Sequence, residues 1–463
     1  MIDVDRVGIP RGHKGVPTLP DWLTYLESLH PKTIALGLER VAQVWQRLNL
    51  QPNFPIITVG GTNGKGSVCA MLESMLHAAG YRVGCYTSPH LLDYNERVRI
   101  GKTQANDAEL CASFEKIEQA RGNISLTYFE FGTLAAMQCF NKHKVDVAVL
   151  EVGLGGRLDA VNVFDSDCAV VTCVDIDHTD YLGDTREKIA FEKAGIFRSG
   201  KVAVFGDRDV PAAIVNEARR IGAVLWRIGS EFDFQLPSPV GGRAGEGGVA
   251  MERASSSLTL PQKERELMQW DFHGLKGTRN ALPYPALRGN YQLNNASAAL
   301  AALDVLKDKL PVSMAAARRG LVEVTLPGRF QMVPGSPQLI LDVAHNPHAA
   351  RSLAQSLVEM PPCHKTFAVF AMLKDKDIGG VVRALKSQVD GWLVAGLNVP
   401  RGVSSAEMAL ALAGEGVEAR AFSSIENALQ HACNEASEND RIVAFGSFYT
   451  VAEVMRARGL RHA

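Results

Sequence analysis

The sequence predicts an α/β protein with two domains: a larger N-terminal domain built on a mainly parallel sheet with flanking helices, and a smaller C-terminal α/β domain. Three observations predict this fold. Apolar, strand-like runs alternate with helical patterns along most of the chain, which is typical of a parallel sheet with helices on both faces. A glycine-rich turn follows the first strand and opens a helix. A second alternation begins after a proline–glycine break near Phe330, where we place the domain boundary.

The N-terminal domain, residues 1–330, has five expected strands and two clear helical runs. The strands are apolar, often β-branched runs at residues 56–59, 81–86, 145–150, 168–174 and 201–205. SVCAMLESMLHAAG, after the first strand, and YQLNNASAALAALDVL both carry apolar residues at helical spacing. From Phe234 to about Gln262 the sequence becomes aperiodic and rich in Gly, Ser and Pro. We therefore expect a flexible insertion around residues 235–262.

The C-terminal domain, residues 331–463, repeats the alternation in QLILDVAHNPHAA, TFAVFAML, GWLVAGL and RIVAFGSFYTVAEV. A chain of 463 residues with 46% hydrophobic residues is long and apolar enough for two or three cores. The formal net charge of −1 gives no indication of a nucleic-acid or membrane partner. The eight cysteines are scattered without a C-x-x-C pair, and no apolar run is long enough to span a bilayer. We expect a cytoplasmic protein that acts as a monomer.

The stretch TVGGTNGKGSVCAML, residues 58–72, has the physical features of a phosphate-binding loop but an unusual spelling. In the common P-loop a Ser or Thr follows Gly-Lys directly, whereas here Gly66 intervenes and the hydroxyl arrives at Ser67. A strand, a glycine turn and a helix N-terminus aim N–H groups and a positive dipole end at one point. Lys65 adds a mobile charge suited to a β- or γ-phosphate. The alternative, a glycine-rich turn with a solvated lysine, fits three glycines around one lysine less well.

Polar side chains follow the strands of the first domain, at the end where open parallel sheets bind ligands. They are Ser88 and His90, then Glu151, Arg157 and Asp159, then Asp175, Asp177, His178 and Asp180. We expect a hydroxyl, a carboxylate and an imidazole to converge beside the glycine loop. Oxygen ligands suit Mg²⁺ that bridges nucleotide phosphates, and a His ligand would suit Mn²⁺ too. Taken singly, Glu151 could be a helix-cap carboxylate, and His178 could belong to a surface salt-bridge cluster.

Distinctive strings are spread nearly end to end along the chain: KTIALGLERV, GTNGKGS, TSPHL, NERVRI, SLTYFEFGTLAA, LEVGLGGRLDAVN, DHTDYLG, EKAGIFR, LPGRFQ, DVAHNPHA, MLKDKD and GSFYTV. Together they resemble one family, the dihydrofolate synthase/folylpolyglutamate synthase ligases within the wider Mur-type amide ligases. The G-T-N-G-K-G-S spelling is the P-loop of this superfamily. The resemblance therefore implies a P-loop ATPase domain followed by a Rossmann-like glutamate ligase domain.

The activity that the resemblance implies is an ATP-dependent amide ligation. ATP would phosphorylate a carboxylate of 7,8-dihydropteroate, and later of reduced folates. The amine of L-glutamate would then attack the acyl phosphate, with release of ADP and phosphate. Two Mg²⁺ ions are implied as cofactors, with Mn²⁺ as a substitute. Phosphoryl transfer to a carboxylate depends mostly on positioning and charge neutralisation, which a glycine loop with a lysine can supply.

Roles carry over from the family position by position. ATP would contact Thr62, Asn63, Gly64, Lys65, Gly66 and Ser67, and, across a cleft between the domains, Asn295, Arg329 and Asp342. The metal ions would be held by Ser88, Glu151, His178 and Lys193, the last as a carbamate formed with CO₂. The pterin would lie against Thr33, Ile34, Ala35, Leu36, Thr127, Tyr128, Phe129 and Glu130, with Arg157 and Asp159 nearby. His345 would lie beside glutamate and the acyl phosphate, so Lys65, Lys193, His178 and His345 are the catalytic candidates.

Several alternatives stay open at this point. Lys193 could be an ordinary lysine on a helix surface, and the aromatic residues near Tyr128 could be the core face of a helix. Some must be core, because Phe129, one position after Tyr128, cannot share a helix face with it. A monofunctional folylpolyglutamate synthase would fit much of the pattern. A peptidoglycan Mur ligase would need a further domain before the glycine loop. A regulatory NTP-binding protein would be favoured by the guanine-specificity motif N-K-x-D. The nearest string here, NKHK at 141–144, lacks the aspartate.

Overall fold

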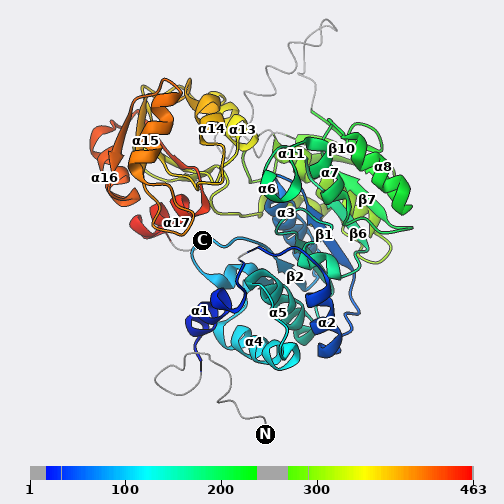
Figure 1. Cartoon of the computed structure of the whole chain (residues 1–463). Coiled ribbons are helices and arrows are strands. Elements are labelled where there is room, and N and C mark those ends of the chain that lie inside the picture. The colour runs from blue at the N-terminus through cyan, green and yellow to red at the C-terminus, as the bar shows by residue number, and fades with distance from the viewer. Residues whose placement is uncertain (1–16, 33, 237–268, 290, 461–463) are drawn as a thin grey trace, which may run out of the picture. The chain divides into compact units, whose positions relative to one another are not determined.

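The computed structural model describes residues 17–32, 34–236, 269–289 and 291–460 (Figure 1). The chain divides into two compact units, each discontinuous in sequence. The first unit comprises Met1–Val174, Thr185–Glu231 and Ala298–Gly320, and the second comprises Asp175–Asp184, Phe232–Ser297 and Leu321–Ala463. The chain passes from one unit to the other within helix α11 (Tyr291–Val305) and again within helix α12 (Met314–Val322). The expected single boundary near Phe330 stays a prediction.

The first unit is built on an eight-stranded sheet with the order β4-β3-β2-β5-β1-β6-β7-β8. Its strands are β1 (Ile56–Gly60), β2 (Val83–Tyr86), β3 (Val98–Ile100), β4 (Thr103–Gln104), β5 (Val147–Glu151), β6 (Cys168–Val171), β7 (Val202–Phe205) and β8 (Val224–Arg227). Six neighbouring strands from β2 to β8 are parallel, and β3 and β4 add an antiparallel edge. The expected mainly parallel sheet is confirmed.

Helices cover both faces of this sheet. They are α1 (Leu19–Leu29), α2 (Glu39–Leu48), α3 (Lys65–Ala78), α4 (Asp107–Arg121), α5 (Tyr128–His143), α7 (Arg186–Ala194) and α8 (Ala212–Ile221), with short 3-10 helices η2 (Tyr94–Arg97) and η3 (Ala160–Val163). Successive side chains of a strand point to opposite faces. Tyr86 accordingly meets Phe129 of α5, whereas the preceding Cys85 meets Arg99, which pairs with Glu73 of α3. Helices α3 and α5 therefore lie on opposite faces.

Aromatic side chains fill the core between α1, α4 and α5. Trp22, Phe114 and Phe131 are almost completely buried, and their ring centroids lie 5.6–6.4 Å apart. Thr18 begins α1 with a capping box, which satisfies N–H groups that the helix itself leaves unpaired. The prediction that some aromatics near Tyr128 belong to the core is confirmed for Phe131.

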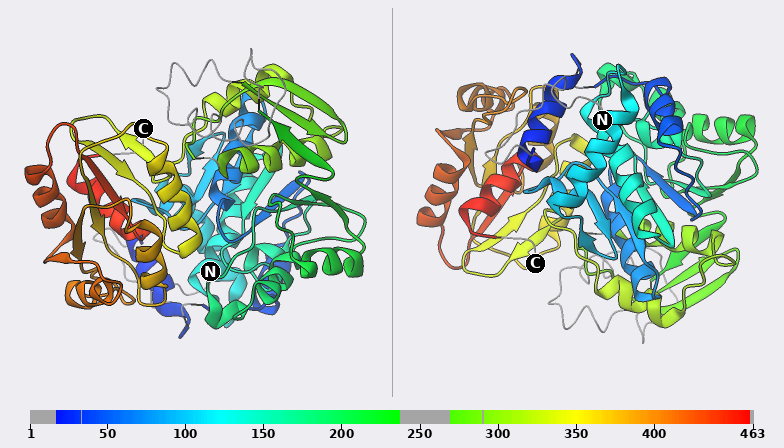
Figure 2. Two further views of the ribbon diagram at one scale, coloured as in Figure 1. Left: turned by 90° about the horizontal axis from the view of Figure 1, so that it is seen from above. Right: turned by 90° about the horizontal axis from the view of Figure 1, so that it is seen from below.

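The second unit contains a six-stranded sheet with the order β12-β13-β17-β14-β15-β16. The strands are β12 (Gln331–Val333), β13 (Gln338–Leu341), β14 (Thr366–Phe370), β15 (Gly391–Ala395), β16 (Ala419–Phe422) and β17 (Arg441–Phe445), all parallel except β12. The helices are α6 (Thr179–Leu182), α13 (Pro347–Val358), α14 (Ile378–Leu385), α15 (Ser405–Gly414), α16 (Ile425–Glu435) and α17 (Phe448–Ala457). Figure 2 shows helices on both sides of these strands, coloured yellow to red. The expected separate α/β domain is confirmed.

A three-stranded sheet, β9 (Phe232–Gln235), β10 (Gln269–Gly274) and β11 (Gly277–Pro283), completes the second unit. The expected loop was therefore placed too early, because Phe234 lies in a strand. Its neighbour Phe232 is buried beside Phe272, and Phe234 contacts Trp270 at 6.1 Å between ring centroids. The rest of the predicted insertion, from residue 237 to 262, lies outside the described residues.

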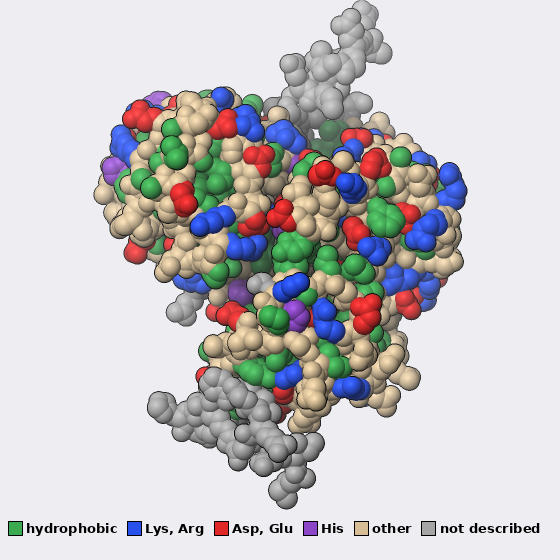
Figure 3. All heavy atoms as spheres, in the orientation of Figure 1, with side chains coloured by type: hydrophobic (Ala, Val, Ile, Leu, Met, Phe, Trp, Pro, Cys, Tyr) green, Lys and Arg blue, Asp and Glu red, His purple; other side chains and the backbone are tan. Residues whose placement is uncertain are grey.

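Two further features bear on the expected partners. Within the described ranges, no helix is both long enough and apolar enough to cross a bilayer. On the face drawn in Figure 3, acidic and basic side chains are interspersed.

Candidate active site

The glycine loop joins β1 to α3 and is fixed to the residues that follow β6. Gly61 has a φ of +142°, and a Cβ there would lie 1.8 Å from Thr172 Oγ1, so only glycine fits. The Thr62 N–H donates to the Cys173 carbonyl at 2.9 Å. Gly64, with a φ of 85°, is the N-cap of α3. The loop and the first turn of α3 thus bring together the predicted ATP contacts Thr62, Asn63, Gly64, Lys65, Gly66 and Ser67.

Lys65 folds back over the loop in this structure. Its ammonium donates to the carbonyls of Gly61 at 3.0 Å and Thr62 at 3.3 Å. These bonds hold a positive charge at the N-terminus of α3, where the helix dipole also favours anions. The arrangement has the chemistry of a phosphate-binding site.

Ser88 and Glu151 lie side by side at the same rim of the sheet. Ser88 follows β2, Glu151 ends the neighbouring parallel strand β5, and the Ser88 N–H donates to Glu151 Oε2 at 3.0 Å. Glu151 is opposite Val59 of β1, so it is level with the start of the glycine loop. Within the described ranges, no three His, Cys, Asp or Glu side chains are grouped so that they could hold a metal ion. Mg²⁺ commonly takes only one or two carboxylates and completes its shell with water and phosphate.

Arg99 of β3, which sequence reasoning missed, ties the Ser88 segment to α3. Its guanidinium donates to both carboxylate oxygens of Glu73 at 2.8–3.1 Å and to Thr87 Oγ1 at 3.1 Å. Glu73 is on α3, and Thr87 directly precedes Ser88. Burial alone would lower the pKa of Arg99, but the Glu73 carboxylate raises it above its ordinary value. The pair therefore stays charged and links the two parts of the rim.

Removing the charge of Arg99 is expected to destabilise the first unit strongly. Arg99→Met leaves the Glu73 carboxylate, whose side chain is 6% exposed, without its partner. Breaking a buried ion pair in this way costs about 3–5 kcal/mol of unfolding free energy. Urea titration followed by circular dichroism measures the change. Arg99→Met combined with Glu73→Leu should recover much of the loss, because a well-packed apolar pair replaces the buried charges.

The matched control is Arg220→Met on α8. Arg220 also pairs with a glutamate, Glu217, but its side chain is 65% exposed, so water replaces the lost contact. We expect a much smaller shift of the urea midpoint than for Arg99→Met. Equal shifts for the two variants would show that the Arg99–Glu73 pair does not stabilise the fold as we infer.

Lys193 lies on α7 and is 4% exposed, so it is not an ordinary lysine on a helix surface. Burial raises the pKa of the Cys173 thiol, and the charges of Lys193 and Lys65 act against this rise. Both lysines are therefore close enough to Cys173 to act on it. Cys173 itself contacts the glycine loop, because its carbonyl accepts the Thr62 N–H and its thiol donates to the Asn63 carbonyl.

The segment after β5 is held by Arg157 and Asp159. The Arg157 N–H donates to the Glu192 carbonyl at 2.7 Å, and its guanidinium pairs with the Glu192 carboxylate at 2.8 Å, which ties the segment to α7. Asp159 accepts the N–H groups of Leu154 at 2.8 Å and Val161 at 3.0 Å. Burial raises the pKa of Asp159 to about 7, although these hydrogen bonds act in the opposite direction. Both residues shape this segment, and their contact with substrate stays a prediction.

The two walls predicted for the pterin are adjacent. Thr33 lies outside the described residues, but Ile34, Ala35 and Leu36 are partly buried before α2. Arg40 of α2 donates to the Ala35 carbonyl at 2.7 Å and pairs with Glu130 of α5 at 2.9 Å. Glu130 also accepts the Thr127 N–H at 2.7 Å in the capping box of α5. Its carboxylate is thus already engaged, and its expected role as a pterin acceptor stays a prediction.

Aromatic rings line the start of α5. Tyr128 and Phe129 are partly buried, and the Phe129 ring occupies the space where a side chain at Gly153 would lie, 2.6 Å from the ideal Cβ position. Tyr128 makes an edge contact with Tyr94, with ring centroids 5.8 Å apart. A flat surface of this kind suits a planar heterocycle.

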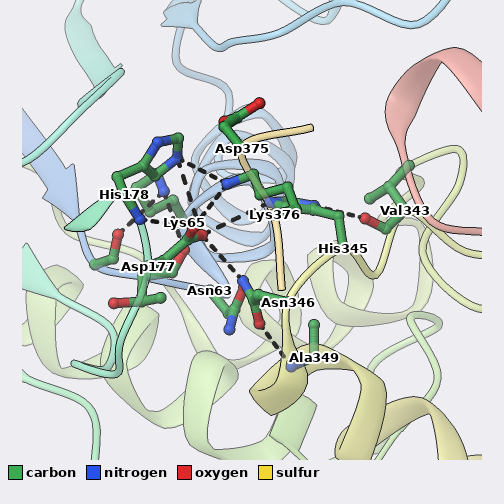
Figure 4. A network of polar contacts seen from close by, with 12 residues as sticks. Asn63, Lys65, Asp177, His178, Val343, His345, Asn346, Ala349, Asp375 and Lys376 are labelled. Atoms are coloured by element: carbon green, nitrogen blue, oxygen red, sulfur yellow. Dashed lines mark hydrogen bonds and ion pairs between the residues drawn. The ribbon is translucent and has the colours of Figure 1, made fainter. Parts of the chain in front are cut away.

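In the second unit, Lys376 and Asp177 form the centre of a polar network, shown in Figure 4. The Lys376 ammonium donates to Asp177 Oδ1 at 2.7 Å and lies 3.3 Å from His178 Nε2. Asn346 donates to Asp177 Oδ2 at 3.1 Å, and His345 Nε2 is 3.8 Å from that oxygen. Burial alone would raise the pKa of Asp177, but His178 and Lys376 hold it well below its ordinary value. The structure thus brings together the predicted His178 and His345.

His345 is a neutral imidazole at neutral pH, because burial lowers its pKa to about 4. Its Nδ1–H donates to the Val343 carbonyl at 2.8 Å, which leaves Nε2 as an acceptor. Lys376, in the string MLKDKD, was not among the predicted site residues. Its side chain is 6% exposed, and only the folded chain shows that it meets Asp177.

The remaining predicted ATP contacts are also in the second unit. Asp342, which follows β13, accepts the N–H groups of Phe330 at 2.8 Å and Ala344 at 2.7 Å. Burial raises the pKa of Asp342, and the charge of Arg329 opposes this rise. Asn295 of α11 donates to Gln292 Oε1 at 3.0 Å. Convergence of these residues, and of His178, with the glycine loop stays a prediction.

Comparison with known proteins agrees with this geometry. The chain matches the Mur ligase middle domain over residues 59–303 and the Mur ligase, glutamate ligase domain over residues 328–448. It is 44% identical to the dihydrofolate synthase/folylpolyglutamate synthase of Escherichia coli (strain K12) over 456 residues, which cover 98% of this chain and 99% of that protein.

Solved structures match over the same length. The structure of E. coli FolC in complex with DHPP and ADP has a TM-score of 0.86 at 44% identity and covers 98% of this chain and 100% of that chain. A bifunctional folylpolyglutamate synthase/dihydrofolate synthase with Mn, AMPPNP and L-glutamate bound has a TM-score of 0.84 at 46% identity, with coverage of 98% and 100%. The chain therefore belongs to the dihydrofolate synthase/folylpolyglutamate synthase family within the Mur ligases, and it is an ATP-dependent ligase.

Proposed function

We propose that this ligase joins L-glutamate to 7,8-dihydropteroate and then to reduced folates, through an acyl phosphate and with release of ADP and phosphate. The observation that carries the proposal is the 44% identity to a relative named for both activities, over 98% of the chain. A related FolC structure holds DHPP and ADP, and another relative holds Mn, AMPPNP and L-glutamate. The expected monomeric state and cytoplasmic location stay predictions.

The rim of the first unit fits a nucleotide and a divalent cation. The glycine loop presents N–H groups, a helix N-terminus and the Lys65 ammonium to the phosphates. Ser88 and Glu151 offer neighbouring oxygen ligands, and His178 and a carbamate on Lys193 would supply the others for two ions. A bound Mg²⁺ or Mn²⁺ would neutralise charge on the phosphates. Asn295, Arg329 and Asp342 would contact the rest of the nucleotide.

The acceptor would lie between the segment 34–36 and the start of α5. Tyr128 and Phe129 offer a partly exposed aromatic surface, and the Gly37 N–H donates to the Leu158 carbonyl at 3.1 Å, which joins the segment after β5 to this wall. The acceptor's carboxylate would then be held towards the glycine loop. His345, neutral and with Nε2 free of a proton, would lie beside the incoming amine and could accept hydrogen bonds from it.

Trapping the activated intermediate tests the proposal. Enzyme, MgATP and dihydropteroate are incubated with hydroxylamine in place of glutamate. We expect a hydroxamate of dihydropteroate and an equal amount of ADP, because hydroxylamine captures acyl phosphates. A parallel reaction with tetrahydrofolate should give the corresponding hydroxamate.

Each other outcome contradicts part of the proposal. Trapping with folates alone would indicate a monofunctional folylpolyglutamate synthase. ADP formation that depends on neither compound would favour an NTP-binding protein of another kind. Omission of MgATP is the control, and it should abolish both hydroxamates.

A further inference from the structure

Arg97, the last residue of η2, is a partly buried cation surrounded by neutral groups. Its guanidinium carbon lies 5.4 Å from the ring centroid of Tyr94 and 5.5 Å from that of Tyr128. Its Nε–H donates to His90 Nδ1 at 2.8 Å. The Tyr86 hydroxyl, a further neutral group, is near enough for the charge of Arg97 to oppose the rise that burial causes in the pKa of Tyr86. Two aromatic faces and the hydrogen bond to His90 therefore fix the position of this charge.

The surroundings of Arg97 differ from those of Arg99 and Arg40, two other partly buried arginines of this unit. Arg99 has Glu73 as its counterion, and Arg40 has Glu130. Among the residues that the structure describes, no carboxylate lies within ion-pair distance of Arg97. A charge that is withdrawn from water is usually compensated by an opposite charge. Arg97 thus has the features of a site that an anionic ligand completes.

The position of Arg97 indicates which anion this is. Its carbonyl accepts the Thr87 N–H at 3.0 Å, so it lies beside the segment that leads to Ser88. Its guanidinium also contacts Tyr128, in the aromatic surface that we assign to the acceptor. An arginine at this place can bind a carboxylate of the acceptor through two parallel hydrogen bonds.

We propose that Arg97 binds the α-carboxylate of acceptors that already carry glutamate, and so favours the second reaction over the first. This inference rests on the proposed function. Dihydropteroate has a single carboxylate, which must itself be phosphorylated. A folate has two, the α- and γ-carboxylates of its glutamate, and in the reaction that we propose only the γ-carboxylate is phosphorylated. A fixed cation beside the aromatic surface can hold the unreactive carboxylate and direct the other one to ATP.

The test compares the two acceptors in Arg97→Met. Losing a hydrogen-bonded charge pair should lower kcat/KM for tetrahydrofolate by about 10- to 100-fold, mainly through KM. The value for dihydropteroate should change far less. Arg97→Lys, which keeps the charge but not the planar fork, should be intermediate. Arg82→Met is the matched control, because Arg82 is an exposed arginine at the opposite end of β2, and it should change neither value.

A substrate variant separates direct contact from a structural effect. Tetrahydrofolate with an α-carboxamide should be a poor acceptor for the wild-type enzyme, and Arg97→Met should cause little further loss with it. Titration calorimetry of both tetrahydrofolates gives the same comparison without turnover. Equal losses with dihydropteroate and tetrahydrofolate, or a parallel rise in the KM for ATP, would overturn the inference. A wild-type enzyme that binds neither acceptor would instead contradict the proposed function.

Discussion

Lys65→Ala is expected to lower the rate of acceptor-dependent ADP formation by about 10²- to 10³-fold, the usual loss when one preorganised donor to developing charge is removed. The physical reason is that Lys65 is held at the N-terminus of α3 by the carbonyls of Gly61 and Thr62. A charge fixed in this way needs little reorganisation as the phosphoryl group transfers. Alanine leaves the N–H groups of the loop in place but removes this fixed cation.

The fold should survive this change. Gly64 still begins α3, the Thr62 N–H still donates to the Cys173 carbonyl, and the carbonyls that Lys65 contacts can be hydrated. The melting temperature and the far-UV circular dichroism should stay close to wild type. Lys116→Ala, which removes an exposed lysine from α4, is the control and should keep full activity. Near-normal turnover in folded Lys65→Ala would mean that the glycine loop does not bind the transferring phosphate.

The parts of the fold that could be predicted are those with a strong local pattern. The core strands are short apolar runs, and the expected strand at residues 56–59 differs from β1 by one residue. The edge strands β3 and β4 have only three and two residues, too few for a periodic signal. The end of strand β9 falls within the predicted insertion, and no local pattern marks it as a strand, because its pairing with β10 joins residues separated by the Gly/Ser-rich stretch. Pairing between distant segments is not visible in local periodicity.

The site divides in the same way. Parallel strands bring their carboxyl ends to one rim, so the meeting of Ser88 and Glu151 followed from strand order alone. The Lys376–Asp177 pair joins residues 199 positions apart. The Arg99–Glu73 pair joins a residue of strand β3 to a residue of helix α3. From the sequence alone, each of these charged side chains is equally compatible with a solvent-exposed position on the surface. Only packing decides which charges are buried and must therefore be paired.

Lys193→Ala is expected to be nearly inactive, with activity lowered by more than about 100-fold. Even mutation of a residue that only supports a metal ligand lowers metal affinity or activity by about 10- to 100-fold. Lys193 is 4% exposed on α7. A plain ammonium at a site for divalent cations would repel them. A carbamate, formed when the neutral amine adds CO₂, would instead supply an anionic oxygen ligand. Acetate or formate should partly restore activity to Lys193→Ala by filling the space with a carboxylate.

The carbamate can be observed independently of activity. An amine must lose its proton before it adds CO₂, and a free lysine with a pKa of about 10.4 is almost entirely protonated at neutral pH. Carbamate formation therefore needs the neutral amine at Lys193, whose side chain is buried. Wild-type enzyme in ¹³C-labelled bicarbonate should show a carbamate signal by NMR, and Lys193→Ala should not. Lys188→Ala, on the exposed face of the same helix, should keep both the signal and full activity. An active, metal-loaded wild-type enzyme without this signal would leave Lys193 as an unmodified amine and remove it from the metal ligands.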